Sequence, residues 1–215
     1  MNKVDFKKLN KELYAPKAEP SIIKVPAMNF IMVDGRGNPN VIGGEYEKAV
    51  ELLYALSYHI KMSRKGLEAV DSYDYVVPPL EGLWWLEDQN DRNFAQKDKF
   101  CWTSMIRQPE FVTEAIFDQA KIEVAKKKPD LDVSKARLET FEEGQCVQCM
   151  HIGTYDLEDT TIAKIDSYIT NNKLTNAIGT AMTSGRIRHH HEIYMSDPRK
   201  SDPLKMQTIL RHPVL

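Results

Sequence analysis

The alternation of polar and apolar residues near the end of the chain is its most informative pattern. Side chains alternate between the two faces of a strand, and residues 186–195 follow that rule. One face would carry Arg186, Arg188, His190, Glu192 and Tyr194, and the other Ile187, His189, His191, Ile193 and Met195. The second face becomes more apolar towards its C-terminal end, which suits packing. The first face, with a carboxylate beside an imidazole and a phenol, is either wetted surface or the floor of a pocket.

The first half of the chain predicts three strands and one amphipathic helix. Residues 21–34 are rich in Ile, Val and Phe and predict a strand, which the turn at 34–39 ends. Apolar residues at three- and four-residue steps then predict a helix, through Tyr46, Val50, Leu53, Ser57 and Ile60. Two more strands are expected at 80–86 and 100–107, joined by the polar loop 87–93.

The second half repeats this order after a connecting segment. A helix over 111–127, with Pro109 before it, and a short strand over 136–141 form the connection. The remaining elements are a strand at 145–152, a helix with Ile162, Ile165 and Ile169 on one stripe, and strands at 186–195 and 204–212.

Each half therefore reads strand, helix, strand, strand. We predict an α+β fold of tandem duplicated β-α-β-β modules that form an antiparallel sheet, curved because strands twist. Helices would cover one face and a ligand cleft would occupy the other. The expected divisions are an N-terminal arm at 1–20, a first half at 21–108, a connecting helix and strand at 109–144, and a second half at 145–215.

Composition narrows the functional classes. The 29 basic and 31 acidic residues leave a net charge of -2, and no basic block with interleaved aromatics appears, so no nucleic-acid partner is expected. No run approaches the roughly 18 apolar residues that span a bilayer, so no membrane partner is expected. The N-terminus lacks the apolar core of a signal peptide, and three cysteines are too few for a disulfide scaffold. A cytoplasmic, reduced protein is expected.

Five segments carry a resemblance to a known family. They are 13–17 (LYAPK), 29–39 (NFIMVDGRGNP), 77–85 (VPPLEGLWW), 144–155 (GQCVQCMHIGTY) and 190–198 (HHEIYMSDP). In them the chain resembles the gyrase-inhibitor-like (GyrI-like) small-molecule-binding family. The resemblance implies a tandem β-α-β-β fold and a cleft for hydrophobic, often polycyclic or cationic compounds. Similar stand-alone members include cyclopropanoid cyclohydrolases, which add water across the strained ring of DNA-alkylating natural products.

Two residues are the catalytic candidates. Glu192 matches the acidic position of the C-terminal strand that lines the family's cleft. Desolvation among aromatics would raise its pKa toward the range of a general base, although it could instead pair with a cationic ligand or be an exposed strand carboxylate. Tyr194, on the same face, would orient the water or donate to a developing phenolate. A tyrosine that only packs is the alternative.

Aromatic residues are the candidates for walls that hold a flat ligand. Trp84 and Trp85 are adjacent and must point to opposite faces of a strand, so one packs in the core while the other lines the cleft. Trp84 is the choice for the cleft. The other ligand-binding candidates are Trp102, Tyr75, Met105, Tyr155 and His190.

No metal or other cofactor is expected. His189 and His191 would share a strand face and form half of a zinc site, but no third ligand has motif spacing. Strand geometry sends the sulfurs of Cys146 and Cys149 to opposite faces, and no second pair exists.

The sequence leaves three functional hypotheses. The first is a cofactor-independent hydrolase that opens strained, hydrophobic electrophiles with water and so protects the cell, acting as a monomer or weak homodimer. The second is a small-molecule binding or sensor module without chemistry. The third is a protein-interaction role that resembles gyrase inhibition.

Overall fold

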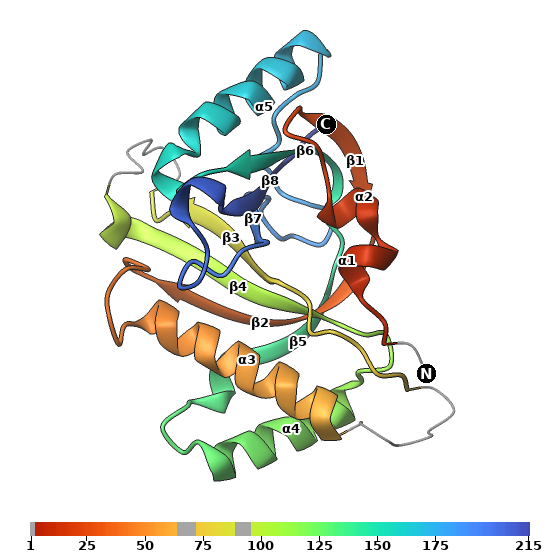
Figure 1. The fold of residues 1–215 in the computed structure, drawn as a ribbon, viewed down its shortest axis with the longest axis vertical. Coiled ribbons are helices and arrows are strands. Elements are labelled where there is room, and N and C mark those ends of the chain that lie inside the picture. The colour runs from red at the N-terminus through yellow and green to blue at the C-terminus, as the bar shows by residue number, and fades with distance from the viewer. Residues whose placement is uncertain (1–2, 64–71, 89–95) are drawn as a thin grey trace. The chain divides into compact units, whose positions relative to one another are not determined.

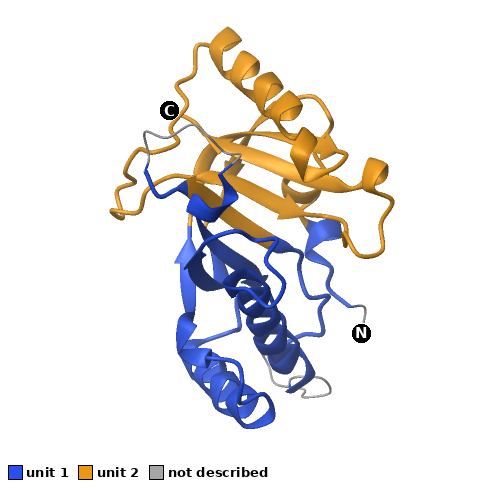
Figure 2. Cartoon of the chain, turned by 90° about the vertical axis from the view of Figure 1, so that its left-hand side faces the viewer, with its two compact units in different colours: residues 1–9, 28–80, 86–141 blue, residues 10–27, 81–85, 142–215 orange. Residues whose placement is uncertain are grey.

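The chain divides into two compact units. The computed structural model describes residues 3–63, 72–88 and 96–215 (Figure 1). Residues 89–93 of the expected polar loop lie outside these ranges. Unit 1 comprises residues 1–9, 28–80 and 86–141, and unit 2 comprises residues 10–27, 81–85 and 142–215 (Figure 2). Within the described ranges, no helix is long and apolar enough to cross a bilayer.

Unit 1 contains the antiparallel strands β4-β2-β5 and two long helices. The central strand, β2 (Met28–Arg36), pairs with β4 (Phe100–Gln108) and β5 (Ala136–Phe141). Helix α3 (Glu45–Ser63) packs on β2 and β4, and α4 (Glu114–Lys127) packs on α3. The structure confirms the amphipathic helix, since Leu53, Ser57 and Ile60 of its predicted stripe are buried.

The strand expected over 21–34 is in fact two strands. β1 (Ser21–Val25) belongs to unit 2, whereas β2 belongs to unit 1. Pro26 lies between them and has no backbone N–H to donate to a ladder, so the pairing stops there. The expected N-terminal arm also contains two short helices, α1 (Phe6–Leu9) and α2 (Lys11–Tyr14).

Unit 2 contains the antiparallel strands β1-β6-β8-β7-β3. The strands that follow β1 in this order are β6 (Gly144–Ile152), β8 (Gln207–Pro213), β7 (His190–Tyr194) and β3 (Leu80–Leu86), whose residues 81–85 lie in unit 2. Short 3-10 helices are η1 (Lys97–Lys99), η2 (Val133–Lys135), η3 (Tyr155–Leu157) and η4 (Pro203–Lys205). The chain orders β2-α3-β3-β4 and β6-α5-β7-β8 confirm the predicted α+β class and its repeated module.

Two strands begin later than predicted. β7 begins at His190 rather than at 186, because Ile187 pairs instead with Ala181 in an isolated bridge. β8 begins at Gln207 because residues 203–205, with a proline at the start, form a 3-10 turn.

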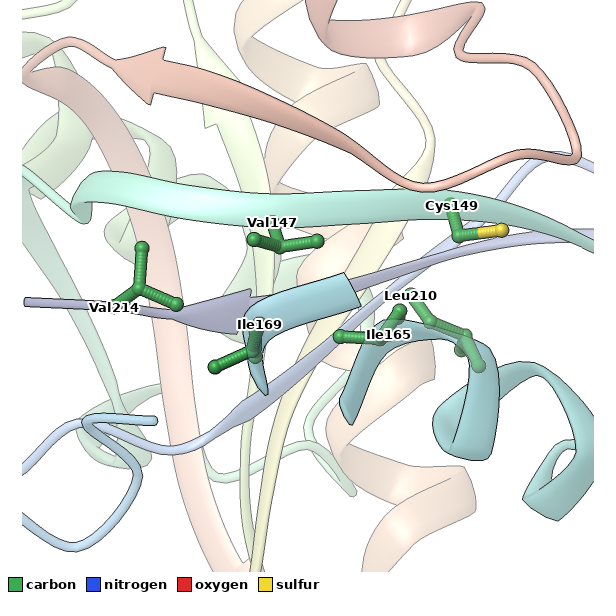
Figure 3. Close-up of a cluster of buried hydrophobic side chains, with 6 residues drawn as sticks. All are labelled: Val147, Cys149, Ile165, Ile169, Leu210 and Val214. Carbon is green, nitrogen blue, oxygen red and sulfur yellow. The ribbon is translucent and has the colours of Figure 1, made fainter. Parts of the chain in front are cut away.

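Helix α5 (Asp159–Asn171) covers one face of the unit 2 strands. Ile165 and Ile169 pack there on a cluster formed by Val147, Cys149, Leu210 and Val214 (Figure 3). Partly buried Ile162 adds to the same cluster, which confirms the predicted stripe. Burying each isoleucine side chain contributes about 1.5–3 kcal/mol, which fixes the helix on this face.

The opposite face of these strands buries charged groups. His191 Nδ1 lies 2.9 Å from Glu143 Oε2, and His191 Nε2 lies 3.1 Å from Glu81 Oε2. The Arg211 guanidinium donates to Glu143 at 3.2 Å and to the Leu13 carbonyl at 3.0 Å. We call Glu81, Glu143, His191 and Arg211 the buried charge network.

The buried charge network anchors α2. Besides the Arg211 bond to Leu13, Gln148 Nε2 donates to the Glu12 carbonyl at 2.6 Å, and Arg211 donates to Gln148 Oε1. Tyr14 donates its hydroxyl to Glu81 at 3.2 Å.

Because two carboxylates face one guanidinium, the network is neutral only when His191 carries a proton. Burial alone would lower the pKa of His191, but the charges of Glu143 and Glu81 and the hydrogen bonds to them together outweigh burial and raise that pKa to about 9.

A close approach in unit 1 gives a stability prediction. Gly35 on β2 lies directly opposite Trp102 on β4, and a Cβ built on Gly35 would overlap the indole ring. Trp102 is held there by Tyr46, whose ring meets it edge-on at 5.2 Å. We expect Gly35→Ala to lower the free energy of unfolding by about 1–3 kcal/mol, measured by denaturant titration. In the double variant with Trp102→Leu the loss should be smaller than the sum of the single losses, and strict additivity would contradict the clash.

Candidate active site in unit 2

The alternation of β7 places three polar side chains on one face. His190, Glu192 and Tyr194 are partly buried, whereas His191 and Ile193 between them are fully buried, as the sequence pattern predicts. Leu210, opposite Glu192 in the β7–β8 register, belongs to the cluster under α5. The Glu192 side chain therefore lies on the face of the unit 2 strands that α5 partly covers. The expected ligand cleft, on a face without helices, stays a prediction.

Both carboxylate oxygens of Glu192 are held by hydrogen bonds. Tyr194 donates its hydroxyl to Oε2 at 2.8 Å, and His190 Nε2 lies 3.2 Å from Oε1. The Trp84 indole N–H donates in turn to the Tyr194 hydroxyl at 2.8 Å. With a side chain 14% exposed, Glu192 is fixed in orientation but still reachable.

A glycine on the neighbouring strand makes this arrangement possible. Gly82 on β3 lies opposite Glu192 in the register, and Trp84 lies opposite His190. A Cβ at Gly82 would stand 2.7 Å from Trp84 Nε1 and 3.2 Å from the Tyr194 hydroxyl oxygen. The missing side chain thus lets the indole and the phenol meet. Nothing in the sequence alone marked Gly82.

Behind His190 lies a second imidazole. His190 Nδ1 and His212 Nε2 are 2.8 Å apart, and His212 Nδ1 is 3.8 Å from Asp166 Oδ1. A carboxylate only accepts hydrogen bonds, so in neutral rings Nε2 of His190 donates to Glu192 and Nδ1 accepts from His212. The neighbouring His212 imidazole lowers the pKa of Asp166. Sequence reasoning missed His212 and Asp166, which come from β8 and α5 and share no motif with His190.

The second carboxyl group of the site, Glu158, was also missed. Glu158 precedes α5, is 7% exposed, and its Oε1 has no hydrogen-bonding partner in the described part of the chain. Burial, followed by the charge of Glu192, raises the pKa of Glu158 to about 10. The site therefore holds a carboxylic acid beside the hydrogen-bonded Glu192 at neutral pH.

Tyr155 lies one turn before Glu158. Its ring meets the Tyr194 ring edge-on, with centroids 5.8 Å apart and planes at 83°. Burial and then the charge of Glu192 raise the pKa of Tyr155 to about 12, so its hydroxyl keeps its proton at neutral pH. The structure thus brings five of the predicted residues together, namely Trp84, Tyr155, His190, Glu192 and Tyr194.

The remaining candidates lie elsewhere. Tyr75, Trp102 and Met105 are buried in unit 1, and their role in ligand binding stays a prediction. Trp85, the tryptophan not chosen for the cleft, stacks on His189 with ring centroids 4.0 Å apart. His189 and His191, which were considered as half of a zinc site, have different partners. His189 stacks on Trp85, and His191 belongs to the buried charge network.

A different trio has the geometry to hold a metal ion. One ligand atom each from Glu158, His190 and Glu192 lie within 4.8 Å of one another. Oxygen and imidazole ligands suit a divalent transition metal. The expectation of a metal-free protein stays a prediction, and the chemistry derived below uses the side chains alone.

Comparisons with known proteins extend this picture. A family model described as a GyrI-like small molecule binding domain matches residues 18–213. None of the curated proteins compared matches the chain. Among solved structures, a conserved protein from Listeria innocua is 51% identical, with a TM-score of 0.88 and coverage of 99% of this chain and 100% of that one.

A structure described as a hydrolase from Listeria innocua is 49% identical, with a TM-score of 0.84 over 99% of this chain and 100% of that one. The C-terminal domain of EcmrR is 10% identical, with a TM-score of 0.53 over 92% of this chain and 97% of that one. At that identity the EcmrR likeness shows the fold alone.

Proposed function

Because this chain belongs to the GyrI-like small-molecule-binding family, we propose that it is a hydrolase that opens strained electrophilic rings of flat, hydrophobic compounds with water. The proposed substrates are cyclopropane-bearing alkylating agents, and the proposed benefit is protection of the cell. The hydrolase named among its relatives supports the reaction type. The observation that carries the proposal is the Glu192 carboxylate, held at both oxygens in a site that remains reachable.

In the proposed reaction Glu192 is the general base. It takes one proton from water while the water oxygen bonds to the ring methylene carbon. The strained carbon–carbon bond breaks, and its electron pair moves through the conjugated system to a carbonyl oxygen, which becomes a phenolate and then takes up a proton. The product is the substrate plus one water. Ring strain lowers the intrinsic activation barrier. A positioned base and a site that partly excludes water provide the remaining lowering of that barrier.

In this proposal Tyr194 orients the base. Its hydroxyl donates to Glu192 and its oxygen accepts from the Trp84 indole N–H, and these two bonds support that role. His190, supported by His212, holds the other oxygen. Fixed donors of this kind keep the base in one geometry while the water reacts.

The test is incubation of the purified protein with a cyclopropane-bearing alkylating agent, followed by mass spectrometry. We expect a product heavier than the substrate by one water, and we expect the same rate after dialysis against a chelator, because the side chains alone perform the proposed step. Recovery of bound but unchanged compound would establish a binding or sensor module and reject the hydrolase. Loss of activity on chelation, restored by a divalent metal, would assign the Glu158, His190 and Glu192 trio to metal binding instead.

A further inference from the structure

Three side chains of unit 2 converge from two elements of the fold. Glu158 lies at the start of α5, and His190 and Glu192 lie on β7. One ligand atom from each is within 4.8 Å of the other two, a spacing at which they can share one metal ion. Glu158 is 7% exposed, and its Oε1 has no hydrogen-bonding partner among the described residues. A buried polar atom without a partner calls for an explanation, and a bound cation is one of the few groups that would satisfy it.

The distance between the two β7 ligands fits zinc. His190 Nε2 and Glu192 Oε1 are 3.2 Å apart. Zinc bonds to nitrogen and oxygen at about 2.0–2.2 Å, so two such bonds that span this distance meet at about 100°, close to the tetrahedral angle. A zinc ion can therefore bridge the two atoms without a change in their separation.

The bonds behind these ligands would hold them in place. Tyr194 donates to Oε2 of Glu192, which leaves Oε1 for the metal. His190 Nδ1 lies 2.8 Å from His212 Nε2, and His212 Nδ1 lies 3.8 Å from Asp166 Oδ1. When Nε2 of His190 binds a metal, its Nδ1 carries the proton and donates to His212, whose own N–H then points toward Asp166. Metal-binding imidazoles almost always have a second partner of this kind.

The charges around the site favour a cation. The charged groups that act on Glu158 are Glu192, Asp159 and Asp156, which are all acidic. A divalent ion would offset this negative charge and would replace the proton of Glu158, since metal ligands bind in their deprotonated form. The side chains of His190 and Glu192 are each 14% exposed, so an ion can reach them from solvent.

We propose that Glu158, His190 and Glu192 form a binding site for a divalent transition-metal ion, and that zinc is the cation it fits best. Three protein ligands leave the fourth position of a tetrahedral zinc ion open to water. The imidazole ligand discriminates against magnesium, which binds through oxygen. The consequence for activity rests on the proposed function: zinc on Oε1 of Glu192 takes the electron pair that would accept a proton from water, so the zinc-bound protein is inhibited.

The first test uses cobalt as a spectroscopic substitute for zinc. Protein dialysed against a chelator and titrated with Co²⁺ should develop visible absorption bands, far more intense than those of hydrated Co²⁺, which saturate at one ion per chain. Zn²⁺ should abolish these bands, and Mg²⁺ at the same concentration should leave them unchanged. Crystals soaked in Zn²⁺ should show an anomalous-scattering peak among the three side chains. Absence of the bands, or zinc bound only elsewhere on the protein, would overturn the proposal.

The second test compares two variants. Glu158→Leu removes one ligand and should lower the affinity for Zn²⁺ by at least about a hundredfold, measured by competition with a chromogenic chelator. The matched control is Asp159→Asn, which removes an exposed acidic group of the same segment but no ligand, and its affinity should stay within about threefold of the wild type. Equal zinc affinity of the two variants would contradict the site, provided that thermal unfolding shows both to be folded.

The outcomes distinguish the metal site from the proposed hydrolase. Zinc binding that depends on Glu158, together with no turnover of alkylating agents, supports the metal site and rejects the hydrolase. Turnover by the metal-free protein that zinc inhibits supports both proposals, whereas turnover without any zinc binding rejects only the metal site. If the zinc-bound protein turns over as fast as the metal-free protein, the metal site stands and Glu192 is not the base.

Discussion

Replacing Glu192 with glutamine is expected to reduce the turnover number for a cyclopropane-bearing alkylating agent by at least about a hundredfold. An amide has nearly the shape of the carboxylate but accepts no proton from water at neutral pH, so the base is lost. The carbonyl oxygen of the new amide can still accept one hydrogen bond from Tyr194, whose hydroxyl lies 2.8 Å from Glu192 Oε2 in the wild type. Ligand affinity should therefore change much less than turnover, and product formation measured by mass spectrometry separates the two.

The matched control is Glu142→Gln, which makes the same chemical change at an exposed position of unit 2. Its turnover should equal that of the wild type. If Glu192→Gln keeps its turnover, Glu192 is not the base. A thermal unfolding curve for each variant shows whether a loss of activity reflects a loss of structure.

The second large effect is on stability. Arg211→Met should lower the free energy of unfolding by about 3–5 kcal/mol, because it leaves Glu143 buried without its guanidinium partner. It also removes the donors to Gln148 Oε1 and to the Leu13 carbonyl. The control Arg199→Met removes an exposed ion pair with Asp197 and should cost no more than about 1 kcal/mol in the same denaturant titration.

The pH dependence of unfolding identifies the buried charge network as the cause. Burial would raise the pKa of Glu143, but His191 and Arg211 outweigh it and lower that pKa to about 2 from 4.5. A lowered pKa gives stability that is present above the unfolded value and is lost as the pH falls through about 2. The pKa of His191 is raised to about 9 from 6.5, so its contribution is full below 6.5 and is lost as the pH rises through about 9.

The network therefore stabilises the wild type most between about pH 4.5 and 6.5. The loss toward alkaline pH should disappear in His191→Gln, which cannot take up the proton. An alkaline loss of the same size in that variant would show that other groups cause it. A cost of Arg211→Met no larger than that of Arg199→Met would mean that the buried pair adds nothing to stability.

Local periodicity accounts for the parts of the fold that were predicted correctly. The repeat of strand, helix, strand and strand, the stripe of Ile162, Ile165 and Ile169, and the common face of His190, Glu192 and Tyr194 all follow from spacing within one element. The prediction of one strand over residues 21–34 was wrong because of a single residue. Pro26 interrupts the apolar run and divides it into two strands that belong to different units.

The sequence by itself determined the α+β class and the family, because the spacing of apolar residues and the family-like segments are local properties of the chain. It also singled out Glu192 as the residue for the proposed chemistry, because side chains alternate along one strand. Only the tertiary structure decided what surrounds Glu192. Trp84 donates a hydrogen bond to Tyr194, which is 110 positions away in the sequence. The other neighbours belong to other elements of the fold, namely His212, Asp166 and Glu158. Hydrogen bonds act over about 3 Å of space, whatever the separation along the chain. The protonation of Glu158 and His191 follows from those neighbours and from burial, which exist only once the chain is folded.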